Sequence, residues 1–257
     1  FKEAKHLDHP VLIHTLTMKG KGYEPAERDP YSWHGTTPFD IATGTFIKSK
    51  AAAPTYTQVF AETTAKMMEQ DERVVAITAA MPDGTGLNKV SPRFPDRVID
   101  VGIAEQHAVT LAAGMALEGM KPICAIYSTF LQRAFDQVVH DVCLMDIPVA
   151  FAIDRGGIVG ADGPTHHGLL DFTFLRALPN MIVMASKDEN ELARMLKTAV
   201  EANHPASVRF PRGNGLGVPM DETLEPVEIG KGELLREGSD GAIIAIGHMV
   251  AAAVEAA

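Results

Sequence analysis

The segment 99–109 reads Ile-Asp-Val-Gly-Ile-Ala-Glu-Gln-His-Ala-Val and places the carboxylate of Glu105 between an apolar stretch and an Ala-rich stretch. We expect a strand that passes directly into a helix, with Glu105 at the junction. An acid in the first helical turn can simply complement the helix dipole, which is worth about 0.3–1 kcal/mol. Alternatively, apolar neighbours desolvate the carboxyl, raise its pKa and make it a proton donor. The local sequence leaves both interpretations open.

Polar groups also follow the other predicted strands of the chain. They lie in a glycine-bearing loop at 81–86, in Tyr127–Phe130 with Arg133, in the long loop 154–168, and in 209–214. Ligands of open parallel sheets bind beyond the carboxyl ends of the strands. We therefore expect these loops and Glu105 to gather on one rim of a sheet.

The elements that would position these groups alternate between strand and helix. The predicted strands are 74–78, 98–101, 121–126, 148–153, 181–185 and 206–210, and the predicted helices are 56–68, 105–117, 131–142, 170–176 and 189–202. The strands are apolar on both faces, which is typical of a buried parallel sheet. The predicted fold class is therefore α/β, a doubly wound, mostly parallel sheet with helices on both faces.

The 257 residues suggest one main domain with remnants of two flanking α/β domains. We assign 1–43 to the tail of a preceding domain, with a strand at 11–17, and 44–54 to a linker. The main domain is 55–214. Residues 215–257 form a connection and the start of another domain, with a strand at 241–246 followed by a helix. We thus expect the middle part of a longer protein.

Composition argues against two classes of partner. No apolar run approaches the ~20 residues that cross a bilayer, and the net charge of -10 opposes binding to a nucleic-acid backbone. Cys124 and Cys143 lie in apolar segments without metal-type spacing, and residues 1–6 do not resemble a signal peptide. These features favour reduced core cysteines and a cytoplasmic protein.

Five motifs make the chain resemble the 1-deoxy-D-xylulose-5-phosphate synthase family, which belongs to the transketolase-like thiamine-diphosphate enzymes. The resemblance covers most of residues 10–215 and rests on Lys-Gly-Lys-Gly-Tyr-Glu-Pro-Ala-Glu (19–27), Asp-Val-Gly-Ile-Ala-Glu-Gln-His (100–107), Tyr-Ser-Thr-Phe-Leu-Gln-Arg-Ala-Phe-Asp-Gln (127–137), Asp-Arg-Gly-Gly-Ile-Val-Gly-Ala-Asp-Gly-Pro-Thr-His (154–166) and Arg-Phe-Pro-Arg-Gly-Asn (209–214).

The resemblance implies a reaction and its cofactors. Pyruvate loses CO2, and the remaining two-carbon unit joins glyceraldehyde 3-phosphate, in a step that supplies isoprenoid and thiamine biosynthesis. Thiamine diphosphate and Mg²⁺ carry this chemistry. The family also implies a homodimer and contact with the amino-terminal domain of the same enzyme. Glu105 would contact N1' of the aminopyrimidine.

The same resemblance assigns further residues to the cofactor. Phe130 resembles the aromatic that stacks on the pyrimidine, although its alternative role is plain core packing. Lys19 is similar to a diphosphate contact, but the neighbouring Lys21 is hard to distinguish from it. Three roles are open for Arg133: contact with the cofactor, binding of the substrate phosphate beside the other arginines, or a structural salt bridge. The cofactor set is Glu105, Tyr23, Phe130, Arg133, Ile103 and Lys19.

Catalytic and substrate residues are implied in the same way. His34, His166 and Asp162 resemble the polar groups around the reacting carbons, where imidazole suits proton transfer near neutral pH. The guanidinium groups that bind the substrate phosphate would be those of Arg155 and Arg212, assisted by Tyr127. Other histidines are left without a catalytic role: His167 is unassigned, and His107 and His140 are expected to pack or face solvent.

One family motif is absent from the sequence. Enzymes of this group bind Mg²⁺ and the diphosphate through Gly-Asp-Gly followed by Asn, and the nearest strings here are Pro-Asp-Gly, Ala-Asp-Gly and Ser-Asp-Gly at 82–84, 161–163 and 239–241. We therefore predict no metal ligands in these residues and expect them in an amino-terminal segment.

Two alternatives remain at this stage. A transketolase or a pyruvate dehydrogenase beta-type subunit would share the Glu105 motif but not the motif at 154–166. A catalytically silent binding or assembly module is the alternative from another class, because the cofactor has little to hold it without the metal-binding domain.

Overall fold

The computed structural model describes residues 1–47 and 53–257 and divides into two compact units, Phe1–Lys50 and Ala51–Ala257. Residues 48–52 of the predicted linker 44–54 lie outside the described residues. The domain boundaries expected from the sequence stay predictions.

The first unit contains little regular structure. A 3-10 turn at Ala4–His6 and the helix α1 (Glu24–Arg28) precede an antiparallel pair, β1 (Phe39–Asp40) and β2 (Thr45–Phe46). Aromatic rings hold this pair, because the Trp33 ring centroid lies 4.6 Å from that of Phe39 and 4.9 Å from that of Phe46.

The strand predicted at 11–17 is wrong. Residues 11–18 form neither helix nor strand, and their apolar side chains, Leu12 and Leu16 among them, are exposed. A strand needs a hydrogen-bonding neighbour, and among residues 1–47 and 53–257 nothing pairs with this segment.

The second unit is built on a six-stranded sheet with the order β4-β3-β5-β6-β8-β7. Every pairing in it is parallel, which confirms the predicted fold class. The strands are β3 (Val74–Thr78), β4 (Val98–Asp100), β5 (Lys121–Tyr127), β6 (Ala150–Asp154), β7 (Ile182–Ala185) and β8 (Ala206–Arg209).

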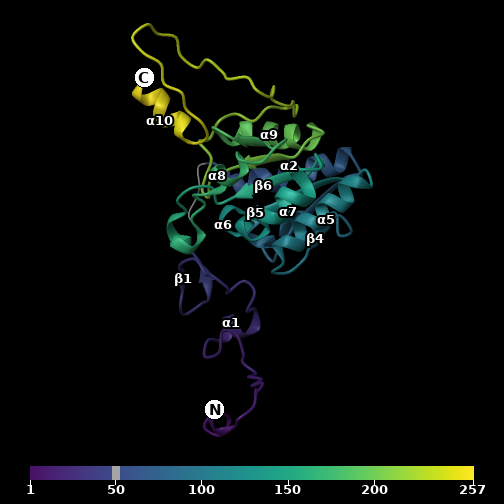
Figure 1. Ribbon diagram of the computed structural model, residues 1–257. Helices are drawn as coiled ribbons and strands as arrows, with labels where there is room; N and C mark the ends of the chain where they lie inside the picture. The colour runs from purple at the N-terminus through teal and green to yellow at the C-terminus, as the bar shows by residue number, and fades with distance from the viewer. Residues whose placement is uncertain (48–52) are drawn as a thin grey trace. The chain divides into compact units, whose positions relative to one another are not determined.

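Helices cover both faces of the sheet (Figure 1). The helices α2 (Tyr56–Gln70) and α9 (Glu189–Glu201) pack on one face over a cluster that includes Phe60, Leu192 and Phe210. The other face carries α5 (Glu105–Leu117), the segment 128–143 and α8 (Asp171–Leu175) over a second cluster. From Ile123 to Ile126, successive side chains of β5 belong alternately to the two clusters, as strand geometry requires.

The beginning of α2 is fixed by capping. The Thr55 hydroxyl accepts the Gln58 N–H, and the Gln58 side chain accepts the Thr55 N–H. The Tyr56 N–H also donates to the Gly213 carbonyl at 3.0 Å, so the first turn of α2 is tied to the segment after β8. These bonds set the position of the next residue, Thr57.

Two elements near the rim differ from expectation. The predicted helix 131–142 is a succession of α6 (Ser128–Leu131), a 3-10 turn (Gln132–Ala134), α7 (Phe135–Gln137) and a π-helix (Val138–Cys143). The predicted loop 81–86 contains the short helix α3 (Pro82–Thr85), followed by α4 (Leu87–Val90). Pro82 at the first turn and the left-handed Gly86 (φ 79°) account for its limits.

In the carboxyl-terminal part, 215–257, the structure contains the predicted helix but not the predicted strand. Residues 241–246 form no strand, and Ile243 and Ile244 are exposed, so that prediction is wrong. The helix expected after them is α10 (Met249–Ala256). Across residues 1–47 and 53–257, no helix has the length and hydropathy that a membrane crossing requires.

Candidate functional site

Eight of the predicted site residues form a continuous chain of contacts at the carboxyl ends of the strands. We call this set the rim cluster, and its members are Glu105, Arg133, Phe130, His166, Tyr127, Arg155, Asp162 and Arg212. They lie at the end of β5 or in the segments that follow β4, β5, β6 and β8, as the parallel topology predicts.

The loop before Glu105 is fixed by Asp100 at the end of β4. One carboxylate oxygen of Asp100 accepts the Ala80 N–H at 2.7 Å and the Gly102 N–H at 3.0 Å. Both residues have left-handed backbones, which Gly102 tolerates freely and Ala80 does not. The side chain of Ile103 in this loop is 83% exposed.

Glu105 begins α5 and its side chain is only 3% exposed. Its Oε1 accepts a hydrogen bond from Arg133 Nη1 at 3.1 Å. The expectation of apolar surroundings was therefore incomplete, because a guanidinium shares the site and attracts the ionised carboxylate. Among the alternatives for Arg133, this structure contains the salt bridge, and 55% of the arginine side chain faces solvent.

Phe130 connects the two ends of the rim cluster. Its ring stacks on that of Tyr127 with centroids 5.7 Å apart, and its edge meets the His166 ring at 5.3 Å. The Arg133 guanidinium carbon lies 5.0 Å from its centroid. Because Phe130 is only half-buried, part of its ring remains accessible to a planar ligand.

Arg155 is the most enclosed cation of the rim cluster, with 11% of its side chain exposed. Its guanidinium lies 4.0 Å from the Tyr127 ring centroid, and Nη1 donates to the Gly84 carbonyl at 2.5 Å and to Asp154 at 2.9 Å. Burial raises the pKa of Tyr127 to about 12, although Arg155 lowers it, so the phenol stays a hydrogen-bond donor at neutral pH.

Asp162 brings together the two arginines that the sequence assigns to a phosphate. Its Oδ2 lies 3.5 Å from Arg155 Nε and 3.1 Å from Arg212 Nε. Arg212 is 40% exposed, and its Nε is the atom that approaches Asp162. Two guanidinium groups therefore converge on one anionic position, with the outer face of Arg212 free to meet a ligand.

The loop that carries Asp162 and His166 is closed at its base. Gly157 and Gly168 exchange backbone hydrogen bonds of 2.8 and 2.9 Å. Arg209 donates to the Gly168 carbonyl at 3.1 Å and to Asp171 at 2.6 Å, and thereby holds the base against the sheet.

The two histidines of this loop have different partners. His166 Nδ1 lies 3.0 Å from the Thr165 hydroxyl, and the ring faces Phe130. His167, which was left unassigned, accepts the Val159 N–H through Nδ1 at 3.3 Å. His167 therefore supports the loop from within.

Lys19, Tyr23 and His34 belong to the unit 1–50. Lys19 and His34 are exposed, while Tyr23 donates to the Ile41 carbonyl at 3.0 Å and meets the Trp33 ring edge-on. The glycines after Lys19 form a turn in which Glu27 accepts the Gly22 N–H at 2.7 Å. The roles predicted for these three residues stay predictions.

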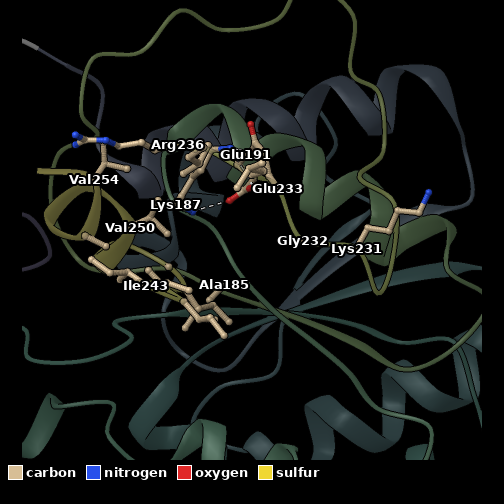
Figure 2. A pocket seen from close by; sticks show the side chains of 18 of the residues that line it. Ala185, Lys187, Glu191, Lys231, Gly232, Glu233, Arg236, Ile243, Val250 and Val254 are labelled. Atoms are coloured by element: carbon tan, nitrogen blue, oxygen red, sulfur yellow. Dashed lines mark hydrogen bonds and ion pairs between the residues drawn. The ribbon is translucent and has the colours of Figure 1, made fainter. Parts of the chain in front are cut away.

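A hollow of about 1430 Å³ lies elsewhere in the second unit, between β7, the start of α9 and residues 227–257. Figure 2 shows Lys187 inside it, paired with Glu233, and its ammonium is also 3.6 Å from Glu191. The lining is mainly aliphatic and backbone, and it contains none of the predicted site residues. The hollow is therefore separate from the rim cluster.

Gly84 is a site residue that the sequence reasoning left unassigned. A Cβ on Gly84 would lie 1.4 Å from the Tyr127 hydroxyl oxygen, so only glycine lets the phenol approach and leaves the carbonyl to Arg155. The Pro-Asp-Gly string marks a turn, but no local signal indicates that a tyrosine from β5 packs against it. In the described part of the chain, no three His, Cys, Asp or Glu side chains cluster in a way that could hold a metal ion.

Comparisons with known proteins were made for sequence and structure. Residues 52–216 match the family model described as the transketolase pyrimidine-binding domain. The 1-deoxy-D-xylulose-5-phosphate synthase 2 of Geobacter sulfurreducens is 60% identical over 258 residues, which is 100% of this chain and 41% of that protein. The synthase of Heliobacterium modesticaldum is 60% identical over 99% of this chain and 39% of its own length. The chain thus spans about 40% of these relatives.

Solved structures give the same fold. A split-gene transketolase, described as an inactive beta4 tetramer, superposes with a TM-score of 0.69 and 28% identity over 80% of this chain and 66% of that chain. A Pichia stipitis transketolase in complex with sedoheptulose 7-phosphate gives a TM-score of 0.65 at 22% identity, over 80% of this chain and 32% of that one. The second similarity concerns the fold alone.

Proposed function

Because the chain belongs to the transketolase pyrimidine-binding domain family of thiamine-diphosphate enzymes, we propose that it forms part of a 1-deoxy-D-xylulose-5-phosphate synthase. The whole enzyme would condense pyruvate with glyceraldehyde 3-phosphate and release CO2. The observation that carries this proposal is the pair Arg155 and Arg212, joined by Asp162 and connected through aromatic rings to Glu105. Relatives of 60% identity that bear this enzyme's name support it.

The side chains present suit the aminopyrimidine of thiamine diphosphate. Glu105 offers a buried carboxylate that can share a proton with a ring nitrogen, and Phe130 offers a partly accessible aromatic face. When bound, thiamine diphosphate supplies the carbon nucleophile that attacks pyruvate. Glu105 would hold the proton at the pyrimidine nitrogen, Arg133 would hold Glu105 in place, and the exposed Ile103 would support the ring from the β4–α5 loop.

The other end of the rim cluster suits the acceptor. Arg212 would bind the phosphate of glyceraldehyde 3-phosphate from the open side, while Arg155 and the Tyr127 hydroxyl would bind it from the enclosed side. His166 lies between this region and Phe130, where an imidazole can move a proton at the reacting carbons. We propose a catalytic role for Asp162 in this unit and, from the family resemblance alone, for His34 in the unit 1–50.

Further features belong to the whole enzyme. We propose that Mg²⁺ and the diphosphate are bound by residues beyond this chain, which spans about 40% of its relatives, with Lys19 and Tyr23 as additional cofactor contacts. We also propose a cytoplasmic homodimer that supplies isoprenoid and thiamine biosynthesis.

The test is product identification with the whole enzyme. It is incubated with thiamine diphosphate, Mg²⁺, pyruvate and glyceraldehyde 3-phosphate, and products are followed by mass spectrometry and CO2 release. We expect 1-deoxy-D-xylulose 5-phosphate and CO2 release that rises with the acceptor. CO2 release that is indifferent to the acceptor would indicate another thiamine-diphosphate enzyme. An absence of cofactor binding by calorimetry would indicate a silent module.

A further inference from the structure

Asp154 is a buried carboxylate at the end of β6 that the proposed reaction does not use. Its oxygens accept three hydrogen bonds: the Arg155 backbone N–H at 2.6 Å, Arg155 Nη1 at 2.9 Å and the Thr57 hydroxyl at 3.0 Å. One carboxylate thus holds both the main chain and the guanidinium of the same arginine. The third bond ties it to the first turn of α2.

The backbone of Arg155 needs such support. Its φ of 62° lies in the left-handed region. For any residue other than glycine, this conformation is higher in free energy than the right-handed one. In this conformation the side chain turns back over Tyr127 and reaches the Gly84 carbonyl. The bond from the Arg155 N–H to Asp154 stabilises the conformation directly.

The position of Arg155 in turn affects the second arginine. Asp162 contacts both guanidinium groups, so a shift of Arg155 changes the balance of charge that holds Asp162 beside Arg212. Asp154 is nevertheless fully buried and lies behind Arg155, so it does not line the accessible side of the cluster. Its influence must pass through Arg155.

From this geometry we infer that Asp154, oriented by Thr57, is a positioning residue that fixes Arg155 for the phosphate of the acceptor. This inference rests on the proposed function. Asp154 touches neither substrate nor cofactor. Thr57 acts one step further away, because its hydroxyl keeps the shared oxygen of Asp154 directed at Arg155 Nη1.

The experiment measures discrimination between two acceptors by the whole enzyme. For each variant, kcat/KM is determined with glyceraldehyde 3-phosphate and with unphosphorylated glyceraldehyde at saturating pyruvate, and their ratio is compared with that of the wild type. We expect Asp154→Asn to lower this ratio by about 10-fold or more, mainly through a higher KM for the phosphorylated acceptor, because a charge-assisted contact is weakened. Thr57→Val should lower it by about 3-fold to 10-fold, and Thr57→Ser should restore it.

A matched control is Glu189→Gln. Glu189 is also fully buried and accepts backbone N–H groups from Leu216, Gly217 and Val218 at 2.6–3.0 Å, but it has no contact with Arg155. We expect this variant to be less stable and to keep the wild-type ratio. An equal loss of ratio in Glu189→Gln and Asp154→Asn would reduce the effect to general destabilisation and overturn the inference.

Failure of the proposed function and failure of the positioning role give different results. If the wild type shows no preference for the phosphorylated acceptor, the proposed function fails. If the wild type shows the preference and both Asp154→Asn and Thr57→Val keep it, only the positioning role fails. Should Asp154→Asn not fold, the pair Thr57→Val and Thr57→Ser, which retains Asp154, decides the question.

Discussion

Replacing Glu105 with Gln separates chemistry from stability at the rim cluster. Gln keeps the volume and one accepting oxygen of the side chain, but it cannot give or take the proton that the pyrimidine nitrogen requires. We expect Glu105→Gln to lower the rate of CO2 release from pyruvate at least about 100-fold, the effect of losing a positioned acid–base group.

The structure indicates a small cost in stability. The Glu105 side chain is 3% exposed, whereas its partner Arg133 is 55% exposed and recovers water when the pair is broken. An ion pair with such an exposed partner contributes roughly 0–1 kcal/mol after solvent screening, and removing the buried charge offsets part of this. The thermal midpoint should therefore fall by less than about 4 °C in a domain of this size.

The assay combines three measurements on the whole enzyme with thiamine diphosphate and Mg²⁺. These are CO2 release, exchange of the thiazolium C2 proton into D2O followed by NMR, and the thermal midpoint. Arg133→Gln is the matched control, since it breaks the same 3.1 Å contact and keeps the carboxylate. We expect this variant to retain activity within about 10-fold of the wild type.

Two results would refute this reasoning. Near-normal proton exchange in Glu105→Gln would show that the carboxyl takes no part in cofactor activation. An equally inactive Arg133→Gln would show that the ion pair, and not the proton on Glu105, is what the reaction requires.

Three further predictions concern Arg212 and two residues next to the rim cluster, Gly84 and Asp154. Arg212→Ala should raise KM for glyceraldehyde 3-phosphate about 10-fold to 100-fold and leave KM for pyruvate within about 2-fold; an unchanged acceptor KM in steady-state kinetics would remove Arg212 from the phosphate site. Gly84→Ala should lower the free energy of unfolding by about 1–3 kcal/mol, because its Cβ would collide with the Tyr127 hydroxyl, and a midpoint in urea equal to that of the wild type would contradict the contact. Burial raises the pKa of Asp154 to about 6, although Arg155 and Thr57 lower it, so its carboxyl stabilises the fold fully below about pH 4 and loses this contribution as pH rises through about 6. Urea unfolding of wild type and Asp154→Asn between pH 4 and 8 should therefore show the wild type losing up to about 3 kcal/mol relative to the variant, and a constant difference would contradict the shift.

The fold was predictable where a segment's own pattern decides its structure. The predicted bounds of β3 and α5 match the observed ones. The apolar run of β3 and the Ala-rich stretch of α5 were sufficient, because burial on both faces and helix propensity are properties of the segment itself. The segments 11–17 and 241–246 have the same apolar character, yet neither forms a strand here. Strand formation depends on a neighbouring chain segment, which the pattern does not contain.

For the candidate site, the sequence predicted which loops would share one edge of the sheet but not how their side chains pair, and it left Gly84 out. Topology brought the loops after β4, β5, β6 and β8 to one edge, as expected for a parallel sheet. The contact between Glu105 and Arg133 joins residues 28 positions apart, and the position of Asp162 between two arginines depends on how a long loop closes. Such pairings follow from tertiary packing, and so do the surroundings of Glu105.

The reciprocal hydrogen bonds between Gly157 and Gly168 have a consequence for how acceptor preference can change. Both ends of the loop are joined to each other and held by Arg209, so exposed positions between them, such as Ile158, lie away from the sheet, whereas Val159 is buried. Under the proposed function, substitutions at exposed positions of this loop should change which aldehyde is accepted, whereas Asp162 and His166, which contact the two arginines and Phe130, have to be kept.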